Sequence, residues 1–310
     1  MAEKYFQFYK DLGSIYLKYK IFLKENYAFD GKDDFHGNRD FYHLSKNFTR
    51  NIINYDKQNN LNNYTLLKSA INSIERNFGG MNLENGENSF QKFGSLLKEK
   101  YDEINNRKEY DIVQRVRESI TDLESRYLLI IAKSSISMFL ISGLILESKE
   151  NKKNNKYSVY VGSKFKEDLN KKEYTTKILN KIQNDMETGN LVILKDLEAV
   201  YPLMYDLFNQ NFTAIKGKNY SRLNAGNSAN IFSLVDDKFR CIVNVDIDKI
   251  DGEESPFLNR FEKHILSFED ILSEENISLS KELHEKLLEL ININQDFISI
   301  NNSLKNLLTF

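Results

Sequence analysis

Proline and cysteine are scarce in this chain of 310 residues, which has two prolines and a single cysteine, Cys241. One cysteine excludes a disulfide framework and any zinc site built from several cysteines of the chain. It also fits a reducing compartment. An excess of one charge sign is lacking too, because a charged fraction of 28% leaves a net charge of only −2. The composition therefore gives no case for a nucleic-acid-binding surface.

No apolar signal segment follows Met1, but one apolar stretch, Tyr127–Leu146, needs a membrane test. Its 20 residues carry a single charge, Lys133, and that length is enough to cross a bilayer. A lysine inside a membrane is costly, however. We therefore favour a division into a buried strand over 126–132 and an apolar helix over 133–146, and we expect no membrane span.

Helices alone are expected in the first third of the chain. Apolar residues at the spacing of one helical face predict a first helix over 5–25: Phe8, Leu12, Ile15, Tyr19 and Phe22. Further helices are expected over 41–55, 64–78 and 90–104, and Gly79-Gly80 is a strong stop signal after the helix over 64–78.

Strands and helices alternate from about residue 110 onward. Four apolar runs predict buried strands: 126–132, 157–162, 191–194 and 240–246. Apolar spacing predicts helices over 174–189 and 200–208, and the chain is expected to return to helix after residue 260. The alternation implies an α/β fold with an open, mostly parallel sheet.

A glycine-rich phosphate loop is missing after the first strand. A nucleotide-binding unit needs Gly-x4-Gly-Lys-Ser/Thr there, because the glycines let backbone N–H groups wrap the phosphates. Lys133-Ser134 keeps the Lys-Ser pair, but no glycine occurs between Gly94 and Gly143. We therefore expect no phosphate cradle, and we interpret Lys133 as a surface residue at a helix start.

Acidic residues follow the third apolar run, at the edge of the sheet where such folds bind ligands. Asp196 and Glu198 stand where acids often hold Mg²⁺ in phosphoryl-transfer sites, but acids in this place also cap the following helix. Both interpretations stay open. We treat Asp196, Glu198 and Asn244 of the fourth run as vestigial cofactor-binding positions. The four histidines show no metal-ligand spacing, so we predict no metal site.

Two arginines are candidates for a catalytic role. Arg260 lies in Pro256–His264, and an arginine projecting from a proline-initiated helix start resembles an arginine finger, which stabilises transition-state charge on a neighbour's nucleotide. The alternative is that Arg260 pairs with Glu262 on a solvated helix, with His264 at a helix surface or interface. Arg39 begins a helix, where it is either a lid arginine that contacts a γ-phosphate or a surface residue.

An ordered set of segments, from about residue 35 to 270, resembles mysterin-type giant AAA+ ubiquitin ligases. The segments that carry the resemblance are Gly37–Tyr42, Arg76–Gly80, Arg126–Lys133, Val161–Phe165, Asp185–Gln210, Phe239–Val243 and Pro256–His264. No single motif among them is decisive, but their order is specific.

The resemblance implies a fold and a setting. Mysterin-type proteins are cytosolic, with a row of six AAA+ units and downstream ubiquitin-transfer domains. We expect an AAA+ (P-loop-NTPase-like) parallel sheet with helices on both faces and helical lid segments. The implied parts are an all-helical lid of a preceding unit over 1–108, a degenerate AAA+ core over 109–267 and the start of its lid over 268–310. A cytoplasmic location, neighbouring AAA+ units of the same polypeptide and ubiquitin-transfer machinery as partners are also implied.

The resemblance also implies roles for the two arginines. Arg260 is expected to be a finger from the degenerate unit, and Arg39 a sensor arginine of the preceding lid, both facing one upstream nucleotide. The chain alone is expected to bind no cofactor and to be inactive, with ATP and Mg²⁺ held elsewhere in the parent ring.

Two other functions stay open on the sequence. One is a non-catalytic scaffold or interaction module with a decayed AAA+ fold. The other is a membrane-anchored helical protein that uses residues 127–146. An unbroken helix over that stretch would remove the opening strand of the sheet, and with it the family resemblance.

Overall fold

The computed structural model describes residues 2–28, 32–84, 86–99, 101, 111–133, 136–147, 157–165, 168, 172–224 and 230–293. The chain divides into two compact units, Met1–Leu266 and Ser267–Phe310. The helical region and the sheet therefore belong to the same unit, while the predicted domain boundaries at residues 108 and 267 stay predictions.

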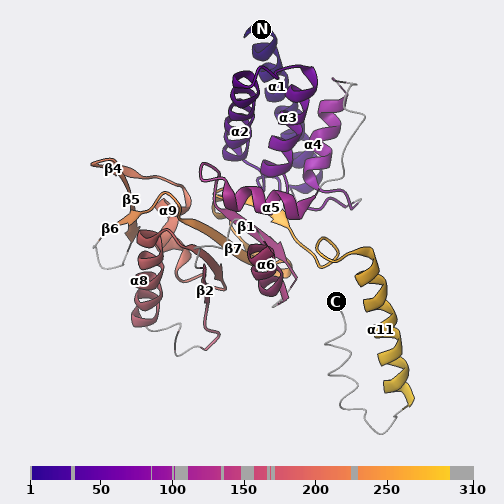
Figure 1. Ribbon diagram of the computed structural model, residues 1–310, viewed down its shortest axis with the longest axis vertical. Coiled ribbons are helices and arrows are strands. Elements are labelled where there is room, and N and C mark those ends of the chain that lie inside the picture. Colours follow the sequence, from indigo (N-terminus) through magenta and orange to yellow (C-terminus); the bar gives the residue numbers. More distant parts are fainter. Residues whose placement is uncertain are drawn as a thin grey trace. The chain divides into compact units, whose positions relative to one another are not determined.

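Four helices form the first part of the larger unit (Figure 1): α1 (Ala2–Tyr27), α2 (Asn38–Lys57), α3 (Asn63–Asn77) and α4 (Ser89–Lys98). Of these, α3 and α4 begin where asparagine side chains satisfy free backbone N–H groups. Asn62 Oδ1 accepts from Thr65 N at 3.0 Å, and Asn88 Oδ1 accepts from Phe90 N at 3.3 Å. The apolar faces meet in an aromatic core, in which the rings of Phe78 and Phe93 lie 4.5 Å apart. The helices predicted over 5–25, 41–55 and 64–78 are confirmed, whereas the one predicted over 90–104 ends at Lys98, and residues 102–104 lie outside the described residues.

A five-stranded parallel sheet forms the second part. Its strands are β1 (Leu128–Ala132), β2 (Tyr157–Val161), β3 (Leu191–Lys195), β7 (Arg240–Asp246) and β8 (Glu262–Ile265), in the order β2-β3-β7-β1-β8. All residues of β1 and β3 are buried, as expected of strands covered on both faces. Flanking helices are α5 (Ile112–Thr121), α6 (Ile136–Glu147) and α8 (Lys172–Thr188). The predicted α/β fold is confirmed, but β2, which was predicted as a buried strand, is a partly exposed strand at the edge of the sheet.

The apolar stretch Tyr127–Leu146 divides as predicted, into β1 and α6. Ala132 ends the strand, and the helix begins at Ile136. Among the helices of the described residues, none is long and apolar enough to cross a membrane.

The prediction of helix directly after residue 260 is wrong for residues 262–265. A single turn, α10 (Ser255–Leu258), is followed by β8, which pairs with β1 at the edge of the sheet. Glu262 and His264 are therefore buried strand residues, and His264 is not at a helix surface. The charged sequence of β8 looked solvent-exposed, but partners from the helical region neutralise these charges and allow the strand to be buried.

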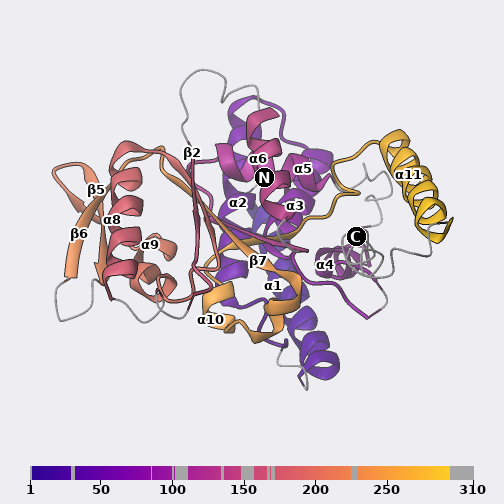
Figure 2. The same ribbon diagram turned by 90° about the horizontal axis from the view of Figure 1, so that it is seen from below.

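A second, three-stranded antiparallel sheet was not predicted. It consists of β4 (Thr213–Ile215), β5 (Lys218–Asn224) and β6 (Asn230–Val235), in the order β4-β5-β6. Lys216 and Gly217 both have positive φ, which is typical of a tight hairpin turn. β6 lies beside α8 (Figure 2). The helix expected over 200–208 is shorter, a 3₁₀ turn η3 (Tyr201–Met204) followed by α9 (Tyr205–Phe208).

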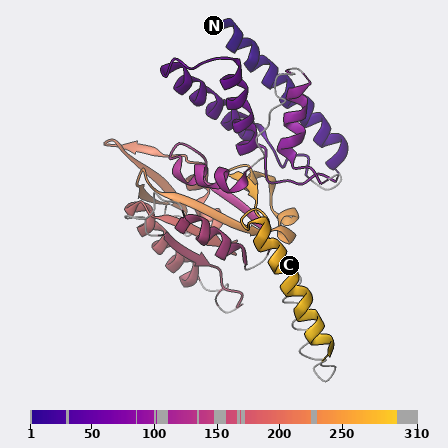
Figure 3. The same ribbon diagram turned by 45° about the vertical axis from the view of Figure 1, so that its right-hand side comes forward.

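The smaller unit contains one long described helix, α11 (Glu274–Ile293), shown in Figure 3. Its apolar residues Leu279 and Leu283 are 62% and 57% exposed. The prediction of helix in this part of the chain is confirmed for the described residues.

Candidate functional site

The carboxyl edge of the parallel sheet places Asn244 next to a lysine. In the strand register, Asn244 of β7 lies opposite Ile130 of β1 and Lys195 of β3. Asn244 Nδ2 donates to the backbone oxygen of Ile130 at 3.1 Å, and Oδ1 accepts from Lys195 Nζ at 2.8 Å. Lys195 Nζ also donates to Asp246 Oδ1 at 2.7 Å. A buried ammonium group therefore fills the space between these strand ends.

Asp196 and Glu198 face a second lysine. Asp196 Oδ1 accepts from Lys249 Nζ at 2.7 Å, and Glu198 Oε1 lies 3.6 Å from the same nitrogen. Lys249 belongs to a 3₁₀ helix, η4 (Ile247–Gly252). The hydrogen bond to Asp196 raises the pKa of Lys249. The two acids proposed as vestigial magnesium positions thus share one ammonium group of the chain itself.

These lysine pairs change what the carboxyl edge can attract. Lys195 and Lys249 offset the negative charge of the nearby acids, so a divalent cation would have to displace an ammonium group before it could bind. Among the residues that the structure describes, no group of three or more His, Cys, Asp or Glu side chains is arranged to hold a metal ion. Lys133 is exposed at the end of β1, and Ser134 of the Lys-Ser pair lies outside the described residues.

Arg39 and Arg260 meet on one face of α9. Arg39 is exposed in the first turn of α2, and its Nη1 donates to Asn209 Oδ1. Arg260 is half-buried, and its guanidinium lies over the Tyr205 ring, 4.0 Å from the centroid. Tyr205 and Asn209 are four residues apart and therefore share a helix face. The structure thus brings the two predicted arginines together, on partners that the sequence did not identify.

Arg260 has charges of both signs nearby. Burial lowers the pKa of Arg260 and so does repulsion from Arg39, whereas Tyr205 and the acids Glu254 and Asp206 raise it. Arg260 Nη1 donates to the backbone oxygen of Pro256, whereas its buried Nε has no hydrogen-bond partner among the described residues. Two guanidinium groups held near each other are a typical site for phosphate oxygens.

The arginine pair and the vestigial acids lie at opposite edges of the sheet. Arg260 precedes β8, whose first residue, Glu262, donates its N–H to the Tyr127 oxygen just before β1. Asn209 and Gln210 directly follow α9 at the same amino edge, where Gln210 Nε2 donates to the Ser125 oxygen at 2.9 Å. Asp196 and Asn244, in contrast, belong to the carboxyl edge. The five predicted residues therefore form two groups and not one site.

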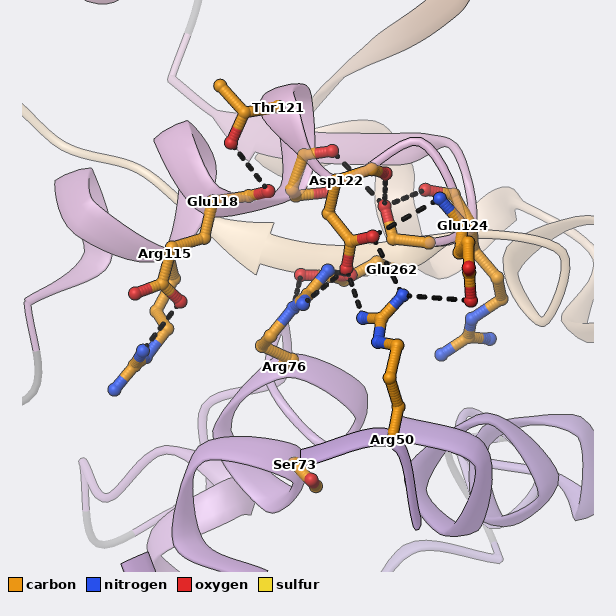
Figure 4. Close-up of polar contacts among 12 residues, drawn as sticks. Arg50, Ser73, Arg76, Arg115, Glu118, Thr121, Asp122, Glu124 and Glu262 are labelled. Atoms are coloured by element: carbon orange, nitrogen blue, oxygen red, sulfur yellow. Dashed lines mark hydrogen bonds and ion pairs between the residues drawn. The ribbon is translucent and has the colours of Figure 1, made fainter. Parts of the chain in front are cut away.

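Buried ion pairs join the helical region to β8, a contact we call the joint; it consists of Asp40, Arg76, Arg126, Glu262 and Lys263. Figure 4 shows Arg76 pointing to Glu262 and Asp122, with Arg50 also reaching Asp122. Arg76 Nε and Nη2 donate to the two carboxylate oxygens of Glu262 at 3.0 and 2.9 Å. Burial alone would raise the pKa of Glu262, but Arg76 and His264 bring it down to about 2.

Asp40 is the second carboxylate of the joint. Its Oδ1 accepts from Arg126 Nη1 at 2.8 Å and from Lys263 Nζ at 2.9 Å. Arg126 Nη2 also donates to Asn77 Oδ1 at 2.8 Å. Burial alone would raise the pKa of Asp40, whereas the charges of Lys263 and Arg126 lower it to about 2. The sequence reasoning missed the joint, although Arg76 and Arg126 open two of the segments that carried the resemblance.

The chain is similar to known proteins over most of its described part. The sequence model of the RNF213 AAA domain family matches residues 117–272, half of the chain. E3 ubiquitin-protein ligase RNF213 of Homo sapiens is 30% identical over 175 residues, 56% of this chain and 3% of the relative. The Mus musculus protein of that name is 28% identical over 176 residues, again 56% of this chain and 3% of the relative.

A third relative extends the similarity. E3 ubiquitin-protein ligase rnf213-beta of Danio rerio is 27% identical over 235 residues, 75% of this chain and 4% of the relative. This match is longer than the span of the family model, so it includes residues outside 117–272. The chain spans only 3–4% of the length of these curated relatives.

Proposed function

The chain belongs to the RNF213 AAA domain family, and on that premise we propose that it is a segment of the AAA+ motor ring of a mysterin-like E3 ubiquitin-protein ligase. In this proposal its α/β unit binds no nucleotide and supplies an arginine finger, Arg260, to a neighbouring site. ATP hydrolysis and ubiquitin transfer belong to other parts of the cytoplasmic parent protein. The partners of the chain are the neighbouring AAA+ units of the same polypeptide.

The observation that carries the proposal is the convergence of Arg39 and Arg260 on the face of α9. One arginine comes from the helical region and the other from the α/β part, and their guanidinium groups lie close enough to lower the pKa of Arg260. Such a pair is suited to the charge that develops on phosphate oxygens during phosphoryl transfer. The helical region then acts as the lid of the preceding unit, and Arg39 as its sensor arginine.

The contacts at the carboxyl edge support the proposal that this unit binds no nucleotide. Lys195 and Lys249 occupy the hydrogen-bonding positions of the acids that would otherwise hold Mg²⁺. The same lysines favour the alternative function, a non-catalytic scaffold with a decayed AAA+ fold. The two functions differ in whether Arg260 affects hydrolysis at a neighbouring site.

Replacement of Arg260 in the longer parent protein tests the proposal. Arg260→Ala is expected to slow ATP hydrolysis at the affected site by a factor of roughly 10³–10⁵, because a finger stabilises charge mainly in the transition state. The matched control is Arg222→Ala, an arginine half-exposed in β5 and paired with Asp206. Turnover that is the same in both variants and the parent would favour the scaffold.

Nucleotide binding by the 310-residue chain is a second test. We expect no binding at micromolar ATP with Mg²⁺, measured by isothermal titration calorimetry. Measurable binding in this concentration range would contradict the proposal that this α/β unit binds no nucleotide.

A further inference from the structure

The residues on both sides of Arg260 are bound to the beginning of α2. Asn259 Nδ2 donates to the backbone oxygen of Asp34 at 3.1 Å, and the backbone oxygen of Asn259 accepts from Arg126 Nη1 at 3.2 Å. Three residues after Arg260, Lys263 Nζ donates to Asp40 Oδ1 at 2.9 Å. The segment that carries Arg260 is therefore held by the helical region at two points.

Asp40 links the two arginines most directly. It follows Arg39 in the first turn of α2, and its Oδ2 accepts from the backbone N–H of Gly37, so it also fixes the start of that helix. Its other oxygen, Oδ1, receives Arg126 and Lys263 from the α/β part. One fully buried carboxylate thus orients the helix start that presents Arg39 and the strand that follows Arg260.

Close packing leaves little freedom at the same place. A Cβ atom on Gly37 would lie 2.8 Å from Asn259 Nδ2, which shows how closely the two segments approach each other. Lys263 Nζ lies 5.3 Å from the centre of the Phe35 ring, so the loop before α2 also covers this lysine. A movement of α2 therefore has to carry the Asn259–Lys263 segment with it.

We propose that Asp40 and Asn259 are positioning residues that hold Arg260 in a fixed relation to Arg39. The meaning of this positioning for hydrolysis rests on the proposed function. The positioning itself is a property of the chain, because Asp40 and Asn259 join the segment that carries Arg39 to the segment that carries Arg260.

The test measures the distance between the two segments in the 310-residue chain. Nitroxide labels are placed on Tyr42→Cys in α2 and Glu254→Cys before α10, both at exposed positions. Cys241 does not take the label because it is 1% exposed. Dipolar electron paramagnetic resonance is expected to show one narrow distance. Asp40→Asn removes the charge that Arg126 and Lys263 share, and is expected to replace the narrow distance with a broad distribution.

A control variant separates positioning from stability. Asp185→Asn removes another buried carboxylate, which accepts from Tyr160 and Asn190 inside the α/β part and has no contact with the joint. It is expected to lower stability and to keep the narrow distance. If Asp40→Asn does not fold, Asn259→Ala decides, because it leaves every buried ion pair in place and is still expected to broaden the distance. A narrow distance in Asn259→Ala, or in a folded Asp40→Asn, overturns the proposal.

Hydrolysis in the longer parent protein connects the positioning to function. Asn259→Ala is expected to lower kcat with little change in KM for ATP, because the neighbouring unit binds the nucleotide and only the finger is misplaced. If Arg260→Ala leaves turnover unchanged, the proposed function fails, while the label distances still decide whether the two segments are coupled. An unchanged kcat in Asn259→Ala, with Arg260→Ala strongly impaired, contradicts the positioning role.

Discussion

The carboxyl edge and the joint contain the same kinds of ion pair in different surroundings. At the carboxyl edge, the side chains of Lys249 and Asp246 are 47% and 24% exposed, while their partners Asp196 and Lys195 are 12% and 8% exposed. At the joint, Glu262 and Lys263 are each 1% exposed, and Asp40 is fully buried. Solvent screens the first set of charges and scarcely reaches the second. The same chemistry therefore has a different effect on stability at the two places.

This difference shows where the fold depends on particular partners. Exposed ion pairs contribute about 0–1 kcal/mol each, so the carboxyl edge tolerates a change of Lys249 better than a change of the buried Lys195. Removal of one partner from a buried pair leaves an uncompensated charge and costs about 3–5 kcal/mol. The contact between the helical region and β8 is thus the strictly constrained one. A joint that is more constrained than the carboxyl edge fits a segment whose proposed role is to present Arg260 and not to bind a nucleotide.

Glu262→Gln should have the largest effect. The change takes from Arg76 its bidentate carboxylate partner, because the neutral amide cannot replace the two charge-assisted hydrogen bonds, and leaves only Asp122, 2.9 Å from Nη1, to balance the buried guanidinium. We expect the free energy of unfolding to fall by about 3–5 kcal/mol, measured by urea denaturation at neutral pH.

The double variant Arg76→Met with Glu262→Met is the control for this prediction. It removes both charges and keeps the volume apolar, so it should recover much of the loss. A loss below about 1 kcal/mol in Glu262→Gln would place the joint in the same class as the exposed pairs, and the comparison would fail.

Acidification should have a smaller effect, again on the helical side. His36 is fully buried, with Nδ1 3.0 Å from the Tyr19 hydroxyl and Nε2 2.9 Å from the Gly79 carbonyl oxygen. Because Nε2 donates to that oxygen and Nδ1 accepts from Tyr19, the ring is neutral. Burial, followed by the charge of Lys263, lowers the pKa of His36 to about 3.

The direction in which stability changes with pH follows from proton binding. Between pH 6.5 and 3 the unfolded chain takes up a proton at His36 and the folded chain does not, so stability falls as the pH falls. From pH 7.5 to 5.0 this histidine should remove about 2 kcal/mol, a range in which Asp40 and Glu262 remain charged in both states. Urea unfolding at both pH values should show a smaller decrease for His36→Gln. An equal decrease in both proteins would exclude His36 as the cause.

Apolar pattern predicted the parts of the fold in which burial and apolarity coincide. β1 and β3 were identified from continuous apolar runs, and α6 from the apolar residues that follow Lys133. β8 was missed because Glu262, Lys263 and His264 are charged or polar, and their burial depends on partners from α2 and α3 that are far away in the sequence. Local periodicity contains no information on such partners.

The candidate site was predictable to a similar degree. Arg39 and Arg260 were selected from segment resemblance and local context, and the structure places them together, although their catalytic role stays a prediction. Tyr205 and Asn209 were not identified as partners of the arginines. A spacing of four residues indicates a shared helix face, but it does not indicate which side chains contact that face. Lys195 stands next to Asp196 in the sequence, yet its contact with Asp246 depends on the pairing of β3 with β7.

Lys249→Met should have the smallest effect, because it removes a partly exposed charge from the carboxyl edge. Lys249 pairs with Asp196 and lies 3.6 Å from Glu198, but the lysine is 47% exposed and Glu198 is 57% exposed, so solvent weakens these interactions. We expect a change below about 1 kcal/mol in the free energy of unfolding, and a smaller difference still at high salt, since the pair is screened there. Urea denaturation at low and high ionic strength measures both. A loss as large as that of Glu262→Gln would mean that the carboxyl edge is as constrained as the joint. The folded structure at this edge would then depend on the ammonium group of Lys249.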